Sequence, residues 1–352
     1  MLRNGIYPTS ILTDYALHIN GERFPSPLRK PSASTDPLAM EVFELIKEWQ
    51  INNRFKLTTS GSTGTPKPIY HSKEAIIQSA RGTADFFSLK EGTKALCCLP
   101  LRKIAGRMML YRSLVNHWEL TVQHPEGNPL KTAKAYDFVA LTPFQAHQVI
   151  KENPAALNQI KTVIIGGAKV DSALIEALQS FNCEVWETYG MTETLTHIAA
   201  KQISPSTQES FHCLPSIQVR VNKEDQLCIS SPYFSEIITN DVVQLIDQCT
   251  FQLLGRKDFV INSGGLKLFP EQIESKLMGA IEDRFYITKS PHDTLGEQVT
   301  IVIESNAYPE DQLQQFKSTI TGLLSKFEVP KKYVFLPHFE ETTTGKIIRK
   351  AL

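Results

Sequence analysis

The feature that most constrains the fold is an alternation of short apolar runs with helical patterns between residues 94 and 189. Four runs have the length and composition of buried strands, at residues 95–99, 138–141, 163–165 and 184–186. Between them, apolar residues recur at helical spacing over residues 108–118, 143–152 and 171–181. This alternation predicts a largely parallel sheet covered by helices on its faces. Ligands bind such sheets at the carboxyl ends of the strands.

Two further helices are expected in the first quarter of the chain. Asp36 lies near the start of the first, whose apolar residues recur every three positions as far as Trp49. Ser72 is placed to cap the second, in which apolar residues recur at intervals of four and three as far as Phe87. A short hairpin is expected around residues 17–21.

The pattern changes after residue 211. Residues 217–221 and 227–230 are separated by a turn and predict a hairpin, so we expect a small β-barrel or sandwich part as far as residue 254. In the last segment Pro270 begins a helix that includes Ile281, residues 299–303 alternate as a strand, and residues 313–327 form an amphipathic helix. The fold class is therefore α/β, with a large N-terminal domain (1–254), a connection at 255–258 and a small α+β C-terminal domain (259–352).

Charge and cysteine content restrict the class of protein. Basic and acidic residues number 37 each, so no charge excess favours nucleic acid or an anionic membrane surface. Neither a signal peptide nor an apolar run long enough to span a bilayer is seen. The six cysteines show no C-x-x-C spacing, which indicates neither a zinc site nor a redox pair and favours a reducing cytoplasm.

Residues 57–68, with the sequence LTTSGSTGTPKP, combine hydroxyls, two glycines and a lysine without an acidic residue. The backbone N–H groups of a glycine-rich turn can surround a polyphosphate, and a lysine neutralises its charge. The spacing Gly-x-x-Gly-x-x-Lys differs from that of a Walker A loop. Taken alone, such a stretch is more often an ordinary surface loop.

Three more segments carry candidate chemistry. Residues 189–194 read YGMTET, residues 255–265 contain GRKD and NSGG, and residues 344–350 read TGKIIRK. Each has a plain structural explanation by itself, as a loop, a charged linker and a solvated basic tail. Together and in this order with the loop at 57–68, they resemble the adenylate-forming superfamily of acyl-CoA synthetases, luciferases and peptide-synthetase adenylation domains. The resemblance covers nearly the whole chain after residue 56.

The resemblance implies a set of roles for residues of this chain. It implies that the ATP β- and γ-phosphates are bound by Thr59, Ser60, Gly61, Ser62, Thr63, Gly64 and Lys67. It gives the adenine site to Gly166, Gly167, Ala168 and Tyr189, within a nucleotide site that also includes Gly190 and Met191. It further implies that Thr192 binds the α-phosphate, Glu193 holds Mg²⁺, and Asp241 receives the ribose hydroxyls with help from Arg256. In the family a glycine usually precedes that aspartate, whereas this chain has Asn240.

The remaining implied roles concern the reaction and a domain rotation. Lys346 would contact the carboxylate and the α-phosphate during adenylation, and Asp258 would be the hinge about which the small domain turns. Gly264 and Gly265 would then allow the pantetheine arm of coenzyme A to pass. Two anions meet in the first step, so a metal ion and an ammonium are needed where charge develops. The implied cofactors and substrates are ATP, Mg²⁺, coenzyme A and a small carboxylic acid.

The acid is indicated by two segments that face the acyl pocket in the family. Residues 99–106 match a P-L-x-H-x-x-G pattern that ends at Gly106, with Lys103 in place of the usual histidine. Lys103 is either a solvated surface residue or a cation facing a second substrate carboxylate. Thr196 and His197 follow the YGMTET segment and resemble the o-succinylbenzoate–CoA ligases of menaquinone synthesis, although His197 could equally start a helix with its ring bonded to backbone. Only 56 residues precede the phosphate loop, which favours a compact substrate.

Three alternatives remain open on the sequence. One is another small aromatic acid–CoA ligase, of benzoate or coumarate type. Another is an adenylating enzyme that loads a carrier protein. The third is a nucleotide-binding module without catalysis, against which the intact Glu193 and Lys346 argue. The oligomeric state is not indicated.

Overall fold

The computed structural model describes residues 17–20, 22–23, 36–58, 68–132, 134–341, 347–350 and 352. The predicted phosphate-binding residues between 59 and 67, and Lys346, lie outside these ranges. The chain divides into two compact units. The first comprises Met1–Val170, Leu174–Gln218 and Ser230–Ile237, and the second comprises Asp171–Ala173, Val219–Ile229 and Ile238–Leu352.

The first unit is built on the predicted parallel sheet. Its strands run in the spatial order β11-β10-β9-β8-β7-β5-β6-β1-β2. The five pairs from β9 to β1 are parallel, and the pairs β9–β10, β10–β11 and β1–β2 are antiparallel. The strands are β1 (Leu17–Ile19), β2 (Glu22–Arg23), β5 (Lys94–Cys97), β6 (Glu119–Val122), β7 (Tyr136–Leu141), β8 (Ile160–Ile165), β9 (Glu184–Gly190), β10 (His197–Ser204) and β11 (Phe211–Cys213).

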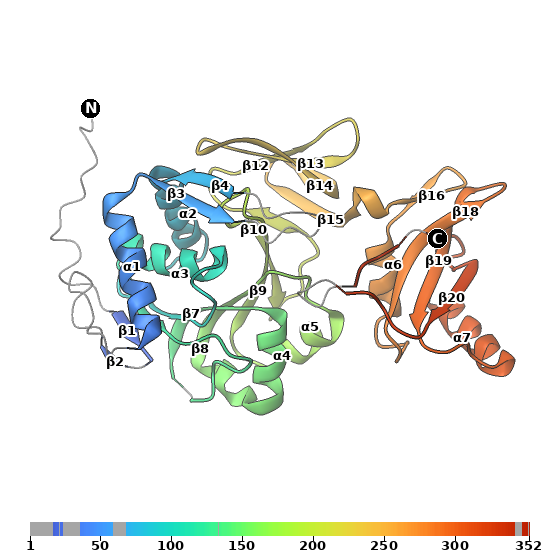
Figure 1. The fold of residues 1–352 in the computed structure, drawn as a ribbon, viewed down its shortest axis with the longest axis horizontal. Coiled ribbons are helices and arrows are strands. Elements are labelled where there is room, and N and C mark those ends of the chain that lie inside the picture. The colour runs from blue at the N-terminus through green and yellow to red at the C-terminus, as the bar shows by residue number, and fades with distance from the viewer. Residues whose placement is uncertain are drawn as a thin grey trace. The chain divides into compact units, whose positions relative to one another are not determined.

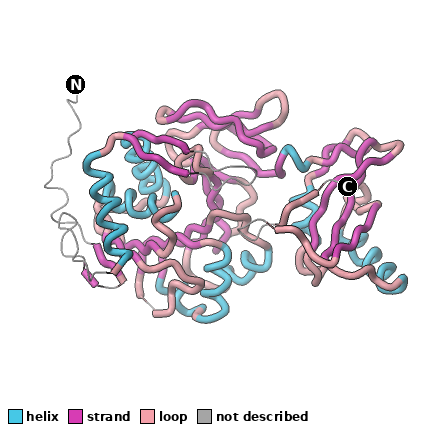
Figure 2. Tube along the Cα trace, in the orientation of Figure 1, coloured by secondary structure: helices cyan, strands magenta, loops and turns pink. Residues whose placement is uncertain are grey.

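Helices cover both faces of this sheet, as Figure 1 shows and as the colouring by secondary structure in Figure 2 makes plain. They are α1 (Pro37–Ile51), α2 (Lys73–Phe86), α3 (Ile104–Asn116), α4 (Pro143–Glu152) and α5 (Ser172–Leu178), with a 3₁₀ turn η2 (Pro154–Gln159) after α4. Successive residues of a strand point to opposite faces. Accordingly, Phe138 and Ala140 of β7 pack with α1, α2 and α3, while Val139 and Leu141 pack with α4 and α5.

Local sequence explains where several helices begin. The Asp36 carboxylate accepts from the Leu38 N–H at 2.8 Å, and the Ser72 hydroxyl accepts from the Ala75 N–H at 3.1 Å, so both predicted caps are confirmed. Helix α4 has the predicted bounds and begins with a capping box between Thr142 and Gln145.

Some predicted helix ends are wrong. Helix α3 ends at Asn116, because His117 adopts a left-handed conformation (φ 54°), so Trp118 lies outside it. Helix α5 spans 172–178 and not 171–181. Strand β9 continues to Gly190, beyond the predicted end at 186, because β10 pairs with it.

The second unit contains the predicted hairpin and the C-terminal α+β part. Strands β12 (Gln218–Val221), β13 (Gln226–Ser231), β14 (Phe234–Asp247) and β15 (Thr250–Arg256) follow one another in a ladder. The predicted hairpin of β12 and β13 is confirmed, and the expected small β-barrel or sandwich part has the form of this four-stranded ladder. A 3₁₀ turn η3 (Lys257–Phe259) follows β15.

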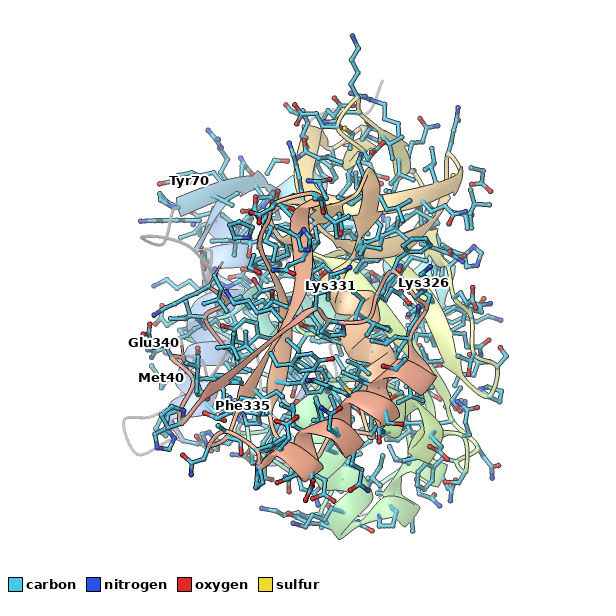
Figure 3. The ribbon with its side chains drawn as sticks, turned by 90° about the vertical axis from the view of Figure 1, so that its right-hand side faces the viewer. Met40, Tyr70, Lys326, Lys331, Phe335 and Glu340 are labelled. Carbon is cyan, nitrogen blue, oxygen red and sulfur yellow. The ribbon has the colours of Figure 1, made fainter. Side chains whose placement is uncertain are left out.

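A second small sheet carries the C-terminal core. It contains β16 (Ile261–Ser263), β17 (Leu266–Leu268), β18 (Phe285–His292), β19 (Gly296–Glu304) and β20 (Lys332–Leu336), with helices α6 (Pro270–Leu277) and α7 (Glu310–Leu323). Of the residues labelled in Figure 3, Lys331 directly precedes β20 and Phe335 lies within it. The helices end earlier than predicted: Ile281 lies beyond α6, and Phe327 lies beyond α7 and is exposed. None of the described helices is long and apolar enough to cross a membrane.

Candidate functional site

The predicted phosphate loop is the connection of a hairpin. Strand β3 (Arg54–Thr58) pairs antiparallel with β4 (Pro68–Ser72), and Thr58 is the register partner of Pro68. The nine residues from 59 to 67 lie outside the described residues, but this pairing holds their two ends together. The hairpin therefore fixes the site from which the loop extends.

His71 joins this hairpin to the segment at residues 189–194. Its Nε2 lies 2.8 Å from the carbonyl oxygen of Thr192. Burial lowers the pKa of His71, and the bond to Thr192 and the charge of Glu193 oppose that shift. A neutral ring with Nε2–H donates to the Thr192 carbonyl, so β4 is fixed beside the predicted α-phosphate and metal residues. His71 was not among the predicted site residues.

Three glycines shape the carboxyl ends of β8 and β9. A Cβ at Gly166 would lie 2.4 Å from the Thr188 hydroxyl, and Gly167 has φ +88°, a region that favours glycine. A Cβ at Gly190 would lie 2.2 Å from the Thr196 carbonyl oxygen, so β10 can approach β9 only because this residue has no side chain. Ala168 is exposed beside Gly167. Gly166–Ala168 and Gly190 thus lie at the edge where the sequence predicted the adenine.

Tyr189 lies at the end of β9 and is half-buried. Its ring centroid is 5.8 Å from that of Phe211, with the planes tilted by 57°. Phe211 is buried, so the Tyr189 ring is supported from one side. A rigid, partly exposed ring is suited to stacking on a base.

Residues 191–195 form a tight turn between β9 and β10. The Thr194 hydroxyl accepts from the Met191 N–H at 3.0 Å and donates to the Thr196 carbonyl at 2.8 Å. The Leu195 N–H donates to the Thr192 carbonyl at 3.0 Å. Glu193 is exposed on this turn. The turn therefore presents a carboxylate at the strand edge.

The donor set fits a metal ion that arrives with a nucleotide. Mg²⁺ in such sites is held by one or two carboxylates together with substrate phosphates. Glu193 supplies one exposed carboxylate, and within the described residues no group of three His, Cys, Asp or Glu could hold a metal by itself. The arrangement matches a Mg²⁺–nucleotide complex better than a resident metal centre.

A buried cation lies beside the start of β10. Arg112, on α3, is 2 % exposed. Its Nη2 donates to the Thr196 hydroxyl at 2.9 Å and lies 3.3 Å from Nδ1 of His197, and its Nε donates to the Thr83 hydroxyl at 3.2 Å. His197 Nε2 in turn lies 3.1 Å from the same Thr83 hydroxyl. These four residues form the Arg112 cluster.

The electrostatics of the Arg112 cluster are unusual. Burial, followed by the charge of Arg112, holds the pKa of His197 well below its usual value, so the ring is neutral. Its Nδ1 accepts from Arg112 and its Nε2–H donates to Thr83. Burial also lowers the pKa of Arg112 to about 9, which leaves it charged at neutral pH. No carboxylate forms an ion pair with Arg112 in the described residues, so the cluster holds a buried, uncompensated positive charge.

A small cavity borders the cluster. It has a volume of about 20 Å³ and is lined in part by Ser79, Gly82, Leu195 and His197. That volume suffices for about one water molecule. The cavity therefore lies against the Arg112 cluster, and its volume is too small to hold a substrate.

Thr196 and His197 were predicted to face the acid, and the structure brings both to Arg112. The alternative that His197 starts a helix is wrong, because it starts strand β10 and its ring bonds to side chains. Arg112 was not among the predicted site residues. A signal was present, since Arg112 is the one charged residue in the mostly apolar run from Met108 to Leu114, and a lone charge there requires a reason.

Lys103 and Gly106 lie at the start of α3. A Cβ at Gly106 would be 2.5 Å from the Pro100 carbonyl oxygen, so this glycine permits close packing of the helix on residues 99–100. Lys103 is the residue before the helix and is exposed. Its proposed contact with a substrate carboxylate stays a prediction, and Arg112 is a second candidate for that contact.

In the second unit Asp241 and Arg256 are register partners on β14 and β15. Arg256 Nη1 lies 3.3 Å from the carboxylate of Asp241, which is buried. The Asn240 amide donates to the carboxylate of Asp258, the predicted hinge residue. The pairing of β14 with β15 therefore brings together the residues predicted for the ribose and the hinge.

Gly264 and Gly265 form the two-residue turn between β16 and β17. Both have positive φ values, +58° and +84°, as tight hairpin turns require. This geometry accounts for both glycines by itself, so their role in a path for coenzyme A stays a prediction.

The described residues nearest to Lys346 are Glu341 and Ile347. Glu341 and Ile347 form an antiparallel bridge across the gap. Arg349 Nη2 lies 2.7 Å from the Glu274 carboxylate on α6, and burial raises the pKa of Glu274 while Arg349 opposes that shift. The residue next to Lys346 is thus held to the C-terminal core.

Comparisons with known proteins agree with this site. A sequence model described as "AMP-binding enzyme" matches residues 52–231. The 2-succinylbenzoate–CoA ligases of Lactococcus lactis and Haemophilus influenzae are 23 % and 24 % identical over 84 % of this chain, which spans 70 % and 69 % of their lengths.

Solved structures give the same result. An acyl-CoA synthetase (AMP-forming)/AMP-acid ligase II-like protein from Dyadobacter fermentans is 36 % identical, with 91 % of this chain and 93 % of that chain covered and a TM-score of 0.62. The o-succinylbenzoate coenzyme A synthetase of Bacillus subtilis, solved with ATP and magnesium, is 19 % identical, with 90 % and 77 % covered and a TM-score of 0.69. The match of the family model to just over half of the chain, on the residues that build this sheet-edge site, shows that the protein belongs to the AMP-binding enzyme family.

Proposed function

We propose that the protein is an ATP-dependent acid–CoA ligase that forms an acyl-adenylate and then an acyl-CoA thioester. The acid's carboxylate oxygen attacks the α-phosphorus of ATP, and the bond to the bridging oxygen breaks to release pyrophosphate. The thiol of coenzyme A then attacks the acyl carbon, and AMP leaves. The carboxylate needs no general base because it is ionised at neutral pH.

Residues of this chain have defined tasks in that scheme. Tyr189 stacks on the adenine, Asp241 with Arg256 binds the ribose, and Thr192 binds the α-phosphate. Glu193 and the phosphates would hold Mg²⁺, whose charge would offset the negative charge that develops at the α-phosphate. Lys346 supplies a second cation for adenylation, and the glycines at 264 and 265 admit the thiol arm after rotation at Asp258.

We propose 2-succinylbenzoate as the acid, as the names of the curated relatives suggest. The observation that carries this choice is the buried charge of Arg112 without an acidic partner among the described residues. One carboxylate of a dicarboxylic acid must stay free to react, and a second carboxylate would compensate Arg112. A benzoate-type monocarboxylic acid has no such group.

The compartment proposed is the cytoplasm, with the product used in menaquinone synthesis. All six cysteines lie within the described ranges, and none is in a disulfide, which agrees with a reducing compartment.

The test is pyrophosphate release across a panel of acids, repeated with coenzyme A. We expect 2-succinylbenzoate to give the highest kcat/KM and to yield a thioester with free coenzyme A. Preference for benzoate or coumarate would overturn the choice of acid. Pyrophosphate release without a thioester would indicate carrier-protein loading, and background release with every acid would indicate a binding module.

A further inference from the structure

The hinge segment is held by side chains of the same compact unit. Asp258, in η3, accepts a hydrogen bond from the Asn240 side-chain amide. Asn240 directly precedes Asp241 on β14, and its side chain is half-buried. A glycine at this position, as is usual in the resembling superfamily, has no side chain with which to reach Asp258. The contact is therefore a property of this chain.

The turn between β12 and β13 holds the same segment from a second direction. Glu224 pairs with Lys257, and Asp225 pairs with Lys267 at 2.5 Å. The turn is preorganised, because the Asn222 side-chain oxygen accepts from the N–H groups of residues 224 and 226 at 2.9 and 3.0 Å. Two adjacent carboxylates thus pair with Lys257, inside the hinge segment, and with Lys267 on β17.

Helix α6 completes the arrangement. The Arg256 N–H lies 3.4 Å from a carboxylate oxygen of Glu271, and a Cβ at Gly255 would lie 2.5 Å from the other oxygen. Glu271 therefore packs directly on the backbone before the hinge. Within this unit, the segment 255–258 is contacted by β14, by the β12–β13 turn and by α6.

We propose that Asn240 is a positioning residue that couples the ribose carboxylate to the hinge. This inference rests on the proposed function, because the proposed function assigns Asp241 to the nucleotide and Asp258 to the rotation between half-reactions. Asp241 and Asn240 are consecutive on one strand, so a nucleotide that orders β14 through Asp241 also orders the amide that holds Asp258. The balance between adenylation and thioester formation is then set in part by this hydrogen bond.

The character of the contacts agrees with a hinge that must open in every turnover. Asp258 is exposed, and the side chains of Glu224, Lys257, Asp225 and Lys267 are each 40–61 % exposed. Exposed ion pairs are weak and are screened by salt. Such contacts favour one arrangement of the hinge without trapping it.

The test uses the full-length protein and the substitutions Asn240→Asp and Asn240→Gly. The first puts a carboxylate beside Asp258, and the second restores the residue usual in the resembling superfamily. Asn306→Asp and Asn306→Gly are matched controls, because Asn306 is exposed in the turn before α7. Two quantities are measured: the rate of tryptic cleavage after Arg256 or Lys257 with and without Mg²⁺–ATP, and the ratio of pyrophosphate release to thioester formation from supplied acyl-adenylate.

We expect Asn240→Asp to raise the cleavage rate by about threefold to tenfold, as the loss of a weak polar contact and its replacement by repulsion imply. Mg²⁺–ATP should protect the variant less from tryptic cleavage than it protects the wild type. The ratio of pyrophosphate release to thioester formation should change at least about threefold. Asn240→Gly should change both quantities in the same direction with a smaller effect. It is the variant that tests the inference if Asn240→Asp does not fold. The Asn306 variants should match the wild type.

The inference would be overturned if both Asn240 variants had the wild-type rate of tryptic cleavage, the wild-type protection by Mg²⁺–ATP and the wild-type ratio of the two half-reactions. Failure of the proposed function is separate, because it would appear as absent pyrophosphate release in the wild type. The cleavage measurement would still test the hydrogen bond between Asn240 and Asp258 in that case.

Discussion

The guanidinium Nη2 of Arg112 lies 3.3 Å from Nδ1 of His197, inside the first unit and shielded from solvent. The two residues lie 85 positions apart in the chain. The hydrogen bond to a neutral imidazole does not neutralise the guanidinium, and burial penalises its charge. The proposal that an anion binds here rests on this charge.

Replacing Arg112 by Met tests this interpretation. Activity on 2-succinylbenzoate should fall at least about 100-fold, because a buried charged contact is lost. The free energy of unfolding should stay the same or rise by up to about 4 kcal/mol, since removal of an unpaired buried charge is often stabilising. Denaturant unfolding and steady-state kinetics measure the two. Arg102→Met, at a side chain that is 89 % exposed, is the matched control; a destabilised Arg112→Met with unchanged turnover would point to a purely structural role.

Lys103→Ala separates the two candidate cations. If Lys103 faces the second carboxylate, kcat/KM for the dicarboxylic acid should fall several-fold while a monocarboxylic acid is unaffected. The loss should be smaller than for Arg112→Met, because an exposed ammonium is screened by water and salt. Lys90→Ala, also exposed, is the control. Equal activity on both acids would assign Lys103 to the solvated surface.

The buried neutral His197 makes stability depend on pH. Its pKa in the folded protein is held below the usual 6.5, first by burial and then by Arg112. The unfolded chain therefore binds a proton that the folded state does not, so the contribution is intact above about pH 6.5 and is lost as pH falls toward the folded pKa. The slope is about 1.4 kcal/mol per pH unit for one proton. His197→Gln should flatten the unfolding free energy between pH 6.5 and 5, and an unchanged slope would show that the ring is not buried neutral.

Gly264→Leu tests the path for coenzyme A. Leucine at φ +58° should cost about 1–2 kcal/mol of stability. Gly279→Leu carries the same kind of strain at φ +84° with open space around it, and it is the matched control. Thioester formation should fall only in Gly264→Leu, while pyrophosphate release persists in both. Similar coenzyme A turnover in the two variants would leave the turn with a structural role alone.

Lys346→Ala tests the two-conformation scheme. Adenylation should be abolished, because the ammonium that offsets the meeting of two anions is removed. Thioester formation from supplied acyl-adenylate should be largely retained. An equal loss of rate in both half-reactions would contradict the scheme in which Lys346 leaves the active site after adenylation and the turn at Gly264 and Gly265 takes its place.

The sequence by itself determined the features that depend on neighbours along the chain. The parallel sheet, the caps at Asp36 and Ser72, and both ends of α4 follow from alternation and from side chains that bond to N–H groups two or three residues away. Gly166 was also found in this way, because it directly follows a predicted strand, whereas the role of Gly264 came from the family resemblance.

Only the tertiary structure decided the contacts that join distant segments. Strand β9 extends to Gly190 because β10 folds back on it, His71 reaches Thr192 across 121 positions, and Asn240 meets Asp258 because β14 pairs with β15. The proposal that Arg112 binds an anion depends on the packing of His197, Thr196 and Thr83 around it. Periodicity shows which face of an element is buried, but it does not show which element from elsewhere in the chain covers that face.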